Sequence, residues 1–163
     1  SKTPERERHF HLIGAMRFET ILLVTDRTVD NKVSSLRDIL KMKGKIGLRR
    51  GTFIGERFQY LMNNEVNFSN KIITISDTAQ MIAMFKKKQI VGFFEEELHF
   101  HYQKKNNSDY KELDIQPVKV ATEPVYIAFS QKTVTPNLLA QLEKANQELI
   151  NKSLLITHYS LLR

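Results

Sequence analysis

Short apolar runs alternate with amphipathic segments along most of the chain. The runs at 20–25, 45–49, 71–75 and 90–94 are rich in Ile, Leu, Val and Phe, which predicts buried strands. Between them, segments 53–62 and 79–85 carry apolar residues at helical spacing. Strand, helix, strand, helix, strand predicts βαβ units. The fold class expected is therefore α/β, with a mostly parallel five-stranded sheet flanked by helices.

The remaining segments have weaker patterns. Ser34 or Ser35 could cap a short helix that ends at Gly44, and Ser76-Asp77 supply a cap for the helix at 79–85. Segments 63–70 and 103–111 are polar and Asn-rich, which predicts a turn and a loop. Two further strands are expected at 113–118 and 125–129, the second antiparallel. Pro136 opens a final helix with an apolar face that ends near Ile150.

Composition narrows the function classes. The chain has 163 residues, 41% hydrophobic and 26% charged, as in a soluble globular protein. It has no cysteine, so thiol catalysis, thiolate metal sites and disulfides are excluded. The net charge of +7 is spread along the chain without a nucleic-acid-binding motif, so we expect no nucleic-acid partner. No nucleophile elbow, phosphate loop or paired-carboxylate spacing is present, so we expect no enzyme and no cofactor.

The segment around Gly51 has the pattern of an anion site. A predicted strand ends at Arg49, Arg50-Gly51-Thr52-Phe53 forms a turn, and a helix follows. The unpaired N–H groups of a first helical turn favour a carboxylate or phosphate, and Thr52 could cap the helix or bind the ligand. The alternative is a turn and a cap with no ligand.

Four of the five histidines occur in two His-Phe-His triplets, at 9–11 and 99–101, and the fifth is His158. On a strand such a pair shares one face and could hold a metal, whereas on a helix the two rings diverge. No third ligand stands at a fixed spacing, so no metal site is predicted.

Four motifs, in order, resemble those of the family 3 extracellular solute-binding proteins, the amino-acid receptors of ABC importers. Segment 34–52 resembles "S-L-x-D-L-K-G-K-x-I-G-V-x-x-G-T" and segment 1–6 resembles "S/T-x-T-x-E-R". Segment 89–96 is similar to "G-R-I-D-A-V-V-x-D", and 123–130 to "E-P-Y-Y-I-A-F-x-K". The resemblance extends from Ser1 to about Ile150.

The resemblance implies roles for particular residues. Arg6 would grip the α-carboxylate of a ligand, with Ser1 touching the same ligand and Gly51-Thr52 as the cradle. Glu96 stands where the family has the aspartate that pairs with the ligand ammonium; this departure implies a remodelled site or a ligand other than a standard α-amino acid. The alternatives are that Arg6 is one of several solvated charges and that 95–97 are acids favoured by a helix N-terminus.

The same resemblance implies a type II periplasmic-binding-protein fold with two hinged lobes. Residues 19–130 would form the second lobe, with 1–18 and 131–163 as parts of an incomplete first lobe whose opening sheet is expected upstream of Ser1. Upstream sequence, including a signal peptide, is expected to have been removed by processing or cloning. The expected function is binding a small polar solute, such as an amino acid, for an ABC permease in the periplasm or outside the cell; alternatives are a sensor domain, an enzyme related to the family and a non-binding relative.

The apolar face of the helix at 136–150 leads to a last expectation. Without the first-lobe sheet, that face would be left in water, which favours association. We expect a homo-oligomer through 1–18, 136–150 and 153–163, or a helix that folds back onto the second lobe. Weak or absent amino-acid binding by the chain as printed is expected as well.

Overall fold

The computed structural model describes residues 2–29 and 32–152. The elements in chain order are α1 (Pro4–Glu7), β1 (Phe10–Asp26), η1 (Leu36–Lys41), β2 (Ile46–Arg49), α2 (Gly55–Asn64), α3 (Val66–Ser69), β3 (Ile72–Ile75), α4 (Thr78–Lys86), β4 (Gly92–Glu96), α5 (Glu97–Asn106), η2 (Ser108–Tyr110), β5 (Leu113–Ser130) and α6 (Pro136–Asn151). The chain divides into two compact units. We call Thr20–Thr122 the central unit, and Ser1–Glu19 with Glu123–Arg163 the outer unit. No described helix is long and apolar enough to span a bilayer.

One five-stranded sheet has the strand order β3-β2-β4-β1-β5. β2 runs parallel to β3 and to β4, and β1 runs antiparallel to β4. The Arg27 N–H donates to the Glu112 carbonyl, and Thr20 lies opposite Thr122, so β5 runs antiparallel to β1. The α/β fold is as predicted, but the sheet is mixed, with parallel pairing among β3, β2 and β4. Those three strands are joined by helical crossovers, as parallel pairing requires.

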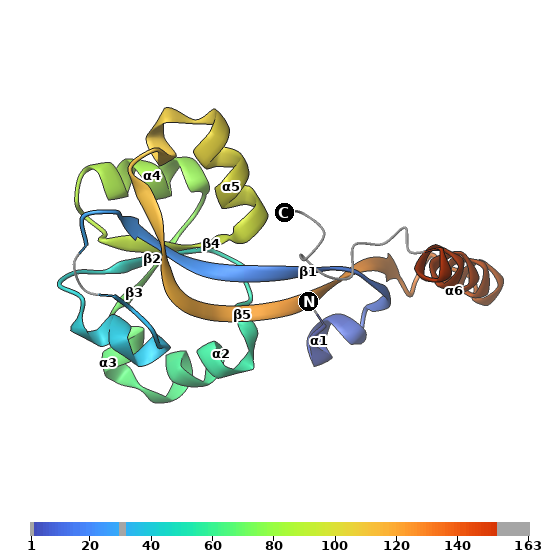
Figure 1. The fold of residues 1–163 in the computed structure, drawn as a ribbon. Coiled ribbons are helices and arrows are strands. Elements are labelled where there is room, and N and C mark those ends of the chain that lie inside the picture. The colour runs from blue at the N-terminus through green and yellow to red at the C-terminus, as the bar shows by residue number, and fades with distance from the viewer. Residues whose placement is uncertain (1, 30–31, 153–163) are drawn as a thin grey trace. The chain divides into compact units, whose positions relative to one another are not determined.

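Two apolar clusters cover the two faces of the sheet in the central unit. Leu23 and Phe94 belong to one cluster, and their chain neighbours Val24 and Phe93 belong to the other. Because successive strand residues point to opposite faces, these strands are buried on both sides. Helices α2 and α3 cover one face, and α4 and α5 cover the other (Figure 1). Burying each such side chain contributes about 1.5–3 kcal/mol.

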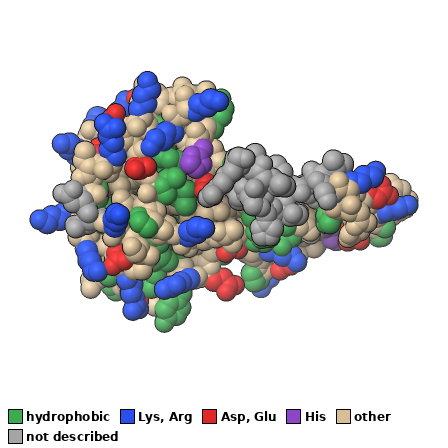
Figure 2. All heavy atoms as spheres, in the orientation of Figure 1, with side chains coloured by type: hydrophobic (Ala, Val, Ile, Leu, Met, Phe, Trp, Pro, Cys, Tyr) green, Lys and Arg blue, Asp and Glu red, His purple; other side chains and the backbone are tan. Residues whose placement is uncertain are grey.

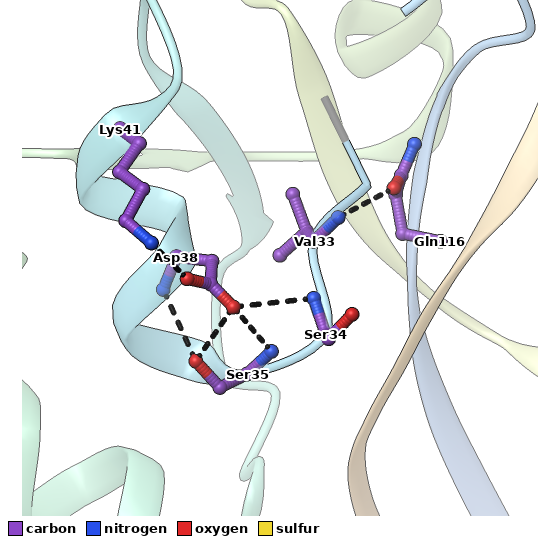
Figure 3. Close-up of polar contacts among 6 residues, drawn as sticks. All are labelled: Val33, Ser34, Ser35, Asp38, Lys41 and Gln116. Carbon is purple, nitrogen blue, oxygen red and sulfur yellow. Dashed lines mark hydrogen bonds and ion pairs between the residues drawn. The ribbon is translucent and has the colours of Figure 1, made fainter. Parts of the chain in front are cut away.

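The short helix η1 begins in a capping box. Ser35 Oγ accepts a hydrogen bond from the Asp38 N–H, and the Asp38 carboxylate accepts one from the Ser35 N–H (Figure 3). Lys41 Nζ donates to the same carboxylate at 2.6 Å. These bonds hold the pKa of Asp38 down at about 2. Ser35 is thus one of the two caps that the sequence indicated, and the helix formed is a 3-10 helix.

A buried glutamine ties the chain leading into η1 to the sheet. Gln116 Oε1 accepts a hydrogen bond from the Val33 N–H at 2.9 Å (Figure 3), and Gln116 Nε2 donates to Thr25 Oγ1 at 2.7 Å. Gln116 is 7% exposed, so both of its polar ends need partners inside the protein.

Three local predictions were wrong. The segment 63–70, which was expected to be a turn, contains α3. A helical turn in this segment allows Phe68 to be fully buried. The strands expected at 113–118 and 125–129 are one strand, β5, of 18 residues, which pairs with the 17-residue β1. The loop expected at 103–111 holds the end of α5 and η2.

The outer unit contains α1 and α6. Thr3 caps α1 by accepting from the Arg6 N–H at 3.3 Å, and Thr135 caps α6, where Pro136 opens the helix as predicted. Two residues of the α6 apolar face, Leu138 and Leu149, are 43% and 38% exposed. The tail at 153–163, named above as an association surface, lies outside the described residues.

Candidate functional site: the carboxyl edge of the central unit

Three neighbouring parallel strands end at one edge of the central unit. Arg49 pairs with Ile75 across β2 and β3, and Gly47 pairs with Phe93 across β2 and β4. Continuing that register by two residues brings Arg49 level with Glu95. The residues at these strand ends therefore meet at one edge of the sheet: Arg50–Phe53 after β2, Ser76-Asp77 after β3, and Glu95-Glu96 at the end of β4. We call this set the carboxyl edge, the position at which α/β sheets bind ligands.

The turn after β2 has the predicted tight geometry. The Arg50 N–H donates to the Ile75 carbonyl at 2.8 Å, and the Thr52 N–H donates to the Arg49 carbonyl at 3.2 Å. Gly51 has φ +77°, a left-handed conformation that glycine adopts without strain. Apart from Gly51 itself and its two chain neighbours, no residue has an atom within 4 Å of the position that a Cβ at Gly51 would occupy, so its surface is open.

Thr52 does not cap the following helix. The N-cap of α2 is Ile54, which has no side-chain acceptor, so the cap is excluded as one of the two roles that the sequence left open for Thr52. Helix α2 begins at Gly55, two residues later than the pattern indicated. Phe53 and Ile54 precede the helix, and Ile54 is 2% exposed in the core. The Thr52 side chain is therefore not consumed by capping.

Two adjacent glutamates at the end of β4 have different surroundings. Glu96 caps α5 by accepting from the His99 N–H at 2.9 Å. The Glu95 side chain is 14% exposed and lies 3.1 Å from His99 Nδ1, with the Tyr110 hydroxyl 3.4 Å from the same oxygen. Burial, together with the Glu95 charge, raises the pKa of Tyr110 far above its usual value. Glu96 at the N-terminus of α5 agrees with the alternative interpretation, in which the acids at 95–97 are favoured by a helix N-terminus. Its position on the carboxyl edge agrees with the interpretation in which it pairs with a ligand ammonium.

Asp77 also belongs to this edge. It caps α4 by accepting from the Gln80 N–H at 2.8 Å, as predicted, and that bond with one from Ser76 lowers the pKa of Asp77. Asp77 is an additional acidic group at the site that sequence reasoning treated only as a cap.

The other predicted site residues lie in the outer unit. Arg6 is in the last turn of α1 with an exposed side chain. Ser1 lies outside the described residues. Next to Arg6, Lys2 and Glu7 form an exposed ion pair at 3.0 Å.

The histidine triplets fall on different elements. His11 is on β1, and His9 is the residue just before that strand. His99 and His101 are on α5, where residues two positions apart point in different directions. Within residues 2–29 and 32–152, no three His, Cys, Asp or Glu side chains gather as metal ligands. Lys and Arg side chains are scattered over the visible face of the central unit (Figure 2).

Solved structures share this fold, although no family model and no curated protein sequence matches the chain. An amino acid ABC transporter substrate-binding protein, AbpA from Streptococcus pneumoniae, bound to L-arginine, matches with a TM-score of 0.71 and 17% identity over 94% of this chain. The chain has the fold of a type II periplasmic binding protein. This confirms the fold that the resemblance implied.

Two further structures show the same fold. Holo ArgBP from T. maritima matches with a TM-score of 0.66 and 14% identity over 91% of this chain and 60% of its own. The AvGluR1 ligand binding domain in complex with serine matches with a TM-score of 0.73 and 13% identity over 94% of this chain. The chain spans 60% of the length of the AbpA and AvGluR1 structures. In a fold of this type, the carboxyl edge is the part of the central unit to consider for ligand binding.

Proposed function

We propose that this chain is part of a protein that binds a small polar solute, most simply an amino acid, without chemical conversion. The observation that supports this most strongly is the carboxyl edge. It combines an open left-handed turn at Gly51 with the acidic groups Asp77 and Glu96 at the ends of parallel strands. The matched structures include proteins bound to arginine, glutamine, serine and phenylalanine. Backbone donors and carboxylates on one edge suit the two ends of a zwitterion.

Each end of the ligand has a proposed partner. Arg50, Gly51 and Thr52 would receive the ligand carboxylate through N–H groups and the Thr52 hydroxyl, with Phe53 bordering its side chain. Glu96 would pair with the ammonium. From the outer unit, Arg6 would add a bidentate guanidinium contact to the carboxylate, and Ser1 a hydroxyl.

The wider role follows from this proposal. The solute would be delivered to an ABC permease, which places the protein in the periplasm or outside the cell. The proposed lobes are 19–130 for the second and 1–18 with 131–163 for the first. β5 ends at Ser130, the last residue of the proposed second lobe, whereas β1 includes both residues 18 and 19. A homo-oligomer involving the exposed leucines of α6 stays part of the proposal.

A receptor domain is the second candidate. The match to the AvGluR1 ligand binding domain is compatible with this role, since that domain shares the fold over 94% of the chain. In that role, ligand-driven closure would bias a signalling partner instead of delivering cargo. Neighbouring permease and ATPase genes would favour import, and a kinase or cyclase domain in the same gene would favour sensing.

The test is a thermal-shift screen of the full-length gene product against amino acids and polyamines, followed by calorimetry of each hit. A ligand that binds the native state raises the melting temperature in a concentration-dependent way. We expect at least one amino acid to do so, and Glu96→Gln to reduce the effect. No shift with any amino acid or polyamine would refute the proposed function.

A further inference from the structure

Polar side chains stand at every fourth residue from Glu95, near the end of β4, through His99 and Gln103 on α5, to Asn107, the residue that follows α5. Each is in contact with the next. Asn107 Nδ2 lies 3.1 Å from Gln103 Oε1, and Gln103 Nε2 lies 3.1 Å from His99 Nε2. His99 Nδ1 in turn lies 3.1 Å from Glu95 Oε2. His99 and Gln103 share a face of α5 because they are four residues apart, and Glu95 and Asn107 continue the line beyond the two ends of the helix.

The direction of every hydrogen bond in this line is set at its far end. The Asp109 N–H donates to Asn107 Oδ1 at 3.0 Å, and a backbone N–H can only donate. The Asn107 amide must therefore present its NH₂ group to Gln103, which accepts with Oε1 and presents its own NH₂ group to His99. His99 Nε2 must then accept, which leaves the hydrogen of a neutral His99 ring on Nδ1, next to Glu95.

The near end of the line holds the carboxylate of Glu95. His99 Nδ1 is within ion-pair distance of that carboxylate but has no partner at hydrogen-bond angles among the described residues, so the contact is electrostatic. The Tyr110 hydroxyl, 3.4 Å away, donates to the same Oε2, and the Glu96 N–H donates to Oε1 at 3.1 Å. Three groups that carry hydrogen thus surround one largely buried carboxylate and connect it to the backbone of Glu96.

We propose that this line of hydrogen bonds fixes His99 as the neutral Nδ1–H tautomer and makes it a positioning residue for Glu95 and Glu96 at the carboxyl edge. Reversing the ring tautomer would place an N–H against the Gln103 NH₂ group and leave the Glu95 side with a lone pair. Turning the Gln103 amide would move the same conflict to Asn107, and turning Asn107 would move it to the Asp109 N–H. One hydrogen bond is lost wherever the reversal stops.

The consequence for ligand binding rests on the proposed function, whereas the tautomer does not. Glu96 also accepts from the His99 N–H, so the first turn of α5 holds both glutamates through one residue. Reversing the direction of the hydrogen bonds in the line would change the contact of His99 with Glu95 directly. It would change the orientation of Glu96 only indirectly, through the first turn of α5. We therefore expect a several-fold effect on the affinity for an amino acid rather than its loss.

The tautomer is measured by long-range ¹H–¹⁵N NMR of the ¹⁵N-labelled full chain, which distinguishes the two ring nitrogens without any ligand. The wild type should show the Nδ1–H tautomer at His99. In Asn107→Asp, one carboxylate oxygen still accepts from the Asp109 N–H, but the other cannot donate. The Gln103 amide should turn around, and His99 should change to the Nε2–H tautomer.

A matched control is the same change one residue earlier. Asn106 donates to the Tyr102 carbonyl, outside the line, so Asn106→Asp adds the same charge near the end of α5 without reversing any bond. It should leave His99 as Nδ1–H. If Asn107→Asp does not fold, Gln103→Leu removes the donor to Nε2 and should give a mixture of tautomers.

The outcomes separate the two proposals. An Nε2–H ring in the wild type, or an unchanged ring in Asn107→Asp or, where that variant does not fold, in Gln103→Leu, overturns the inference. The expected tautomers together with a three- to tenfold loss of amino-acid affinity in Asn107→Asp but not in Asn106→Asp support it in full. The expected tautomers in the chain, with no amino-acid binding by the wild-type full-length gene product, support the fixed ring and refute the proposed function.

Discussion

Gly47 on β2 and Gly51 in the turn after it should both lose stability when replaced by Ala, but for different reasons. Comparing the two losses in the free energy of unfolding tests the geometry of the carboxyl edge. At Gly51 the cost of Ala is conformational, because φ is +77° and no residue beyond its two chain neighbours has an atom within 4 Å of the new Cβ. A left-handed conformation costs an L-residue about 1–2 kcal/mol. At Gly47 the cost is steric, because the new Cβ would lie 2.2 Å from Met81 Sδ and 3.0 Å from the Cδ1 atoms of Ile75 and Ile90. Overpacking of this kind costs about 1–3 kcal/mol.

Single Ala values at the two sites overlap, so second substitutions distinguish the causes. Asn tolerates left-handed backbone, so Gly51→Asn should recover most of the stability that Gly51→Ala loses. Gly47→Asn should be worse than Gly47→Ala. Combining Gly47→Ala with Met81→Ala should give a smaller loss than the sum of the two single changes, because the shortened side chain makes room for the new methyl.

The assay is urea unfolding, with the free energy of unfolding compared at a constant slope with denaturant. We expect Asn to recover the lost free energy of unfolding at Gly51 but not at Gly47. We expect Met81→Ala to reduce the cost of the added methyl at Gly47 but not at Gly51. Equal free energies for Gly51→Ala and Gly51→Asn, or an unchanged stability in Gly51→Ala, would refute the argument that this turn needs a left-handed residue.

Three further predictions follow from named contacts. Hydrogen bonds from Lys41 and Ser35 hold the pKa of Asp38 at about 2, below its usual 3.8. The stability that this cap contributes is therefore present above pH 4 and is lost as the pH falls toward 2. Asp38→Asn should remove this pH dependence from the free energy of urea unfolding. Phe58 is 3% exposed, with ring centroids 5.4 Å from Phe68 and 5.1 Å from Phe94, so Phe58→Ala should lower the free energy of unfolding by about 3–5 kcal/mol, and a loss under about 1 kcal/mol would contradict this packing. In calorimetry, Glu96→Gln should weaken amino-acid binding more than Glu95→Gln, and equal effects would contradict their different surroundings.

The elements that the sequence predicted best are those with a local signal. The apolar run at 71–75 contains β3, and Asp77 caps α4 at the position its residue type favours. The elements it predicted poorly depend on distant partners. β5 is continuous because β1 pairs along its length, and neither strand has an unbroken apolar pattern of its own. α3 forms where Phe68 reaches the core from an Asn-rich segment.

The carboxyl edge was predicted in part. The residue type of Thr52 suited a cap or a ligand contact, and the cap is excluded because α2 begins at Gly55, after the buried Ile54. The contact of Glu95 with His99 was missed because the histidines were considered only as metal ligands. The spacing of Glu95, His99, Gln103 and Asn107 at four residues was the signal available, and it needed the expectation that α5 extends to residue 106.

The most direct test of the account is isothermal titration calorimetry of the full-length gene product with the amino acids that raise its melting temperature, using the wild type, Arg6→Ala and Glu96→Gln. The account predicts saturable micromolar or tighter binding by the wild type. Arg6→Ala should lose about 2–5 kcal/mol of binding free energy, as for a desolvated charge partner, and Glu96→Gln should also bind more weakly. Affinities that are the same in all three proteins would contradict the central claim that these residues bind the two ends of an amino acid.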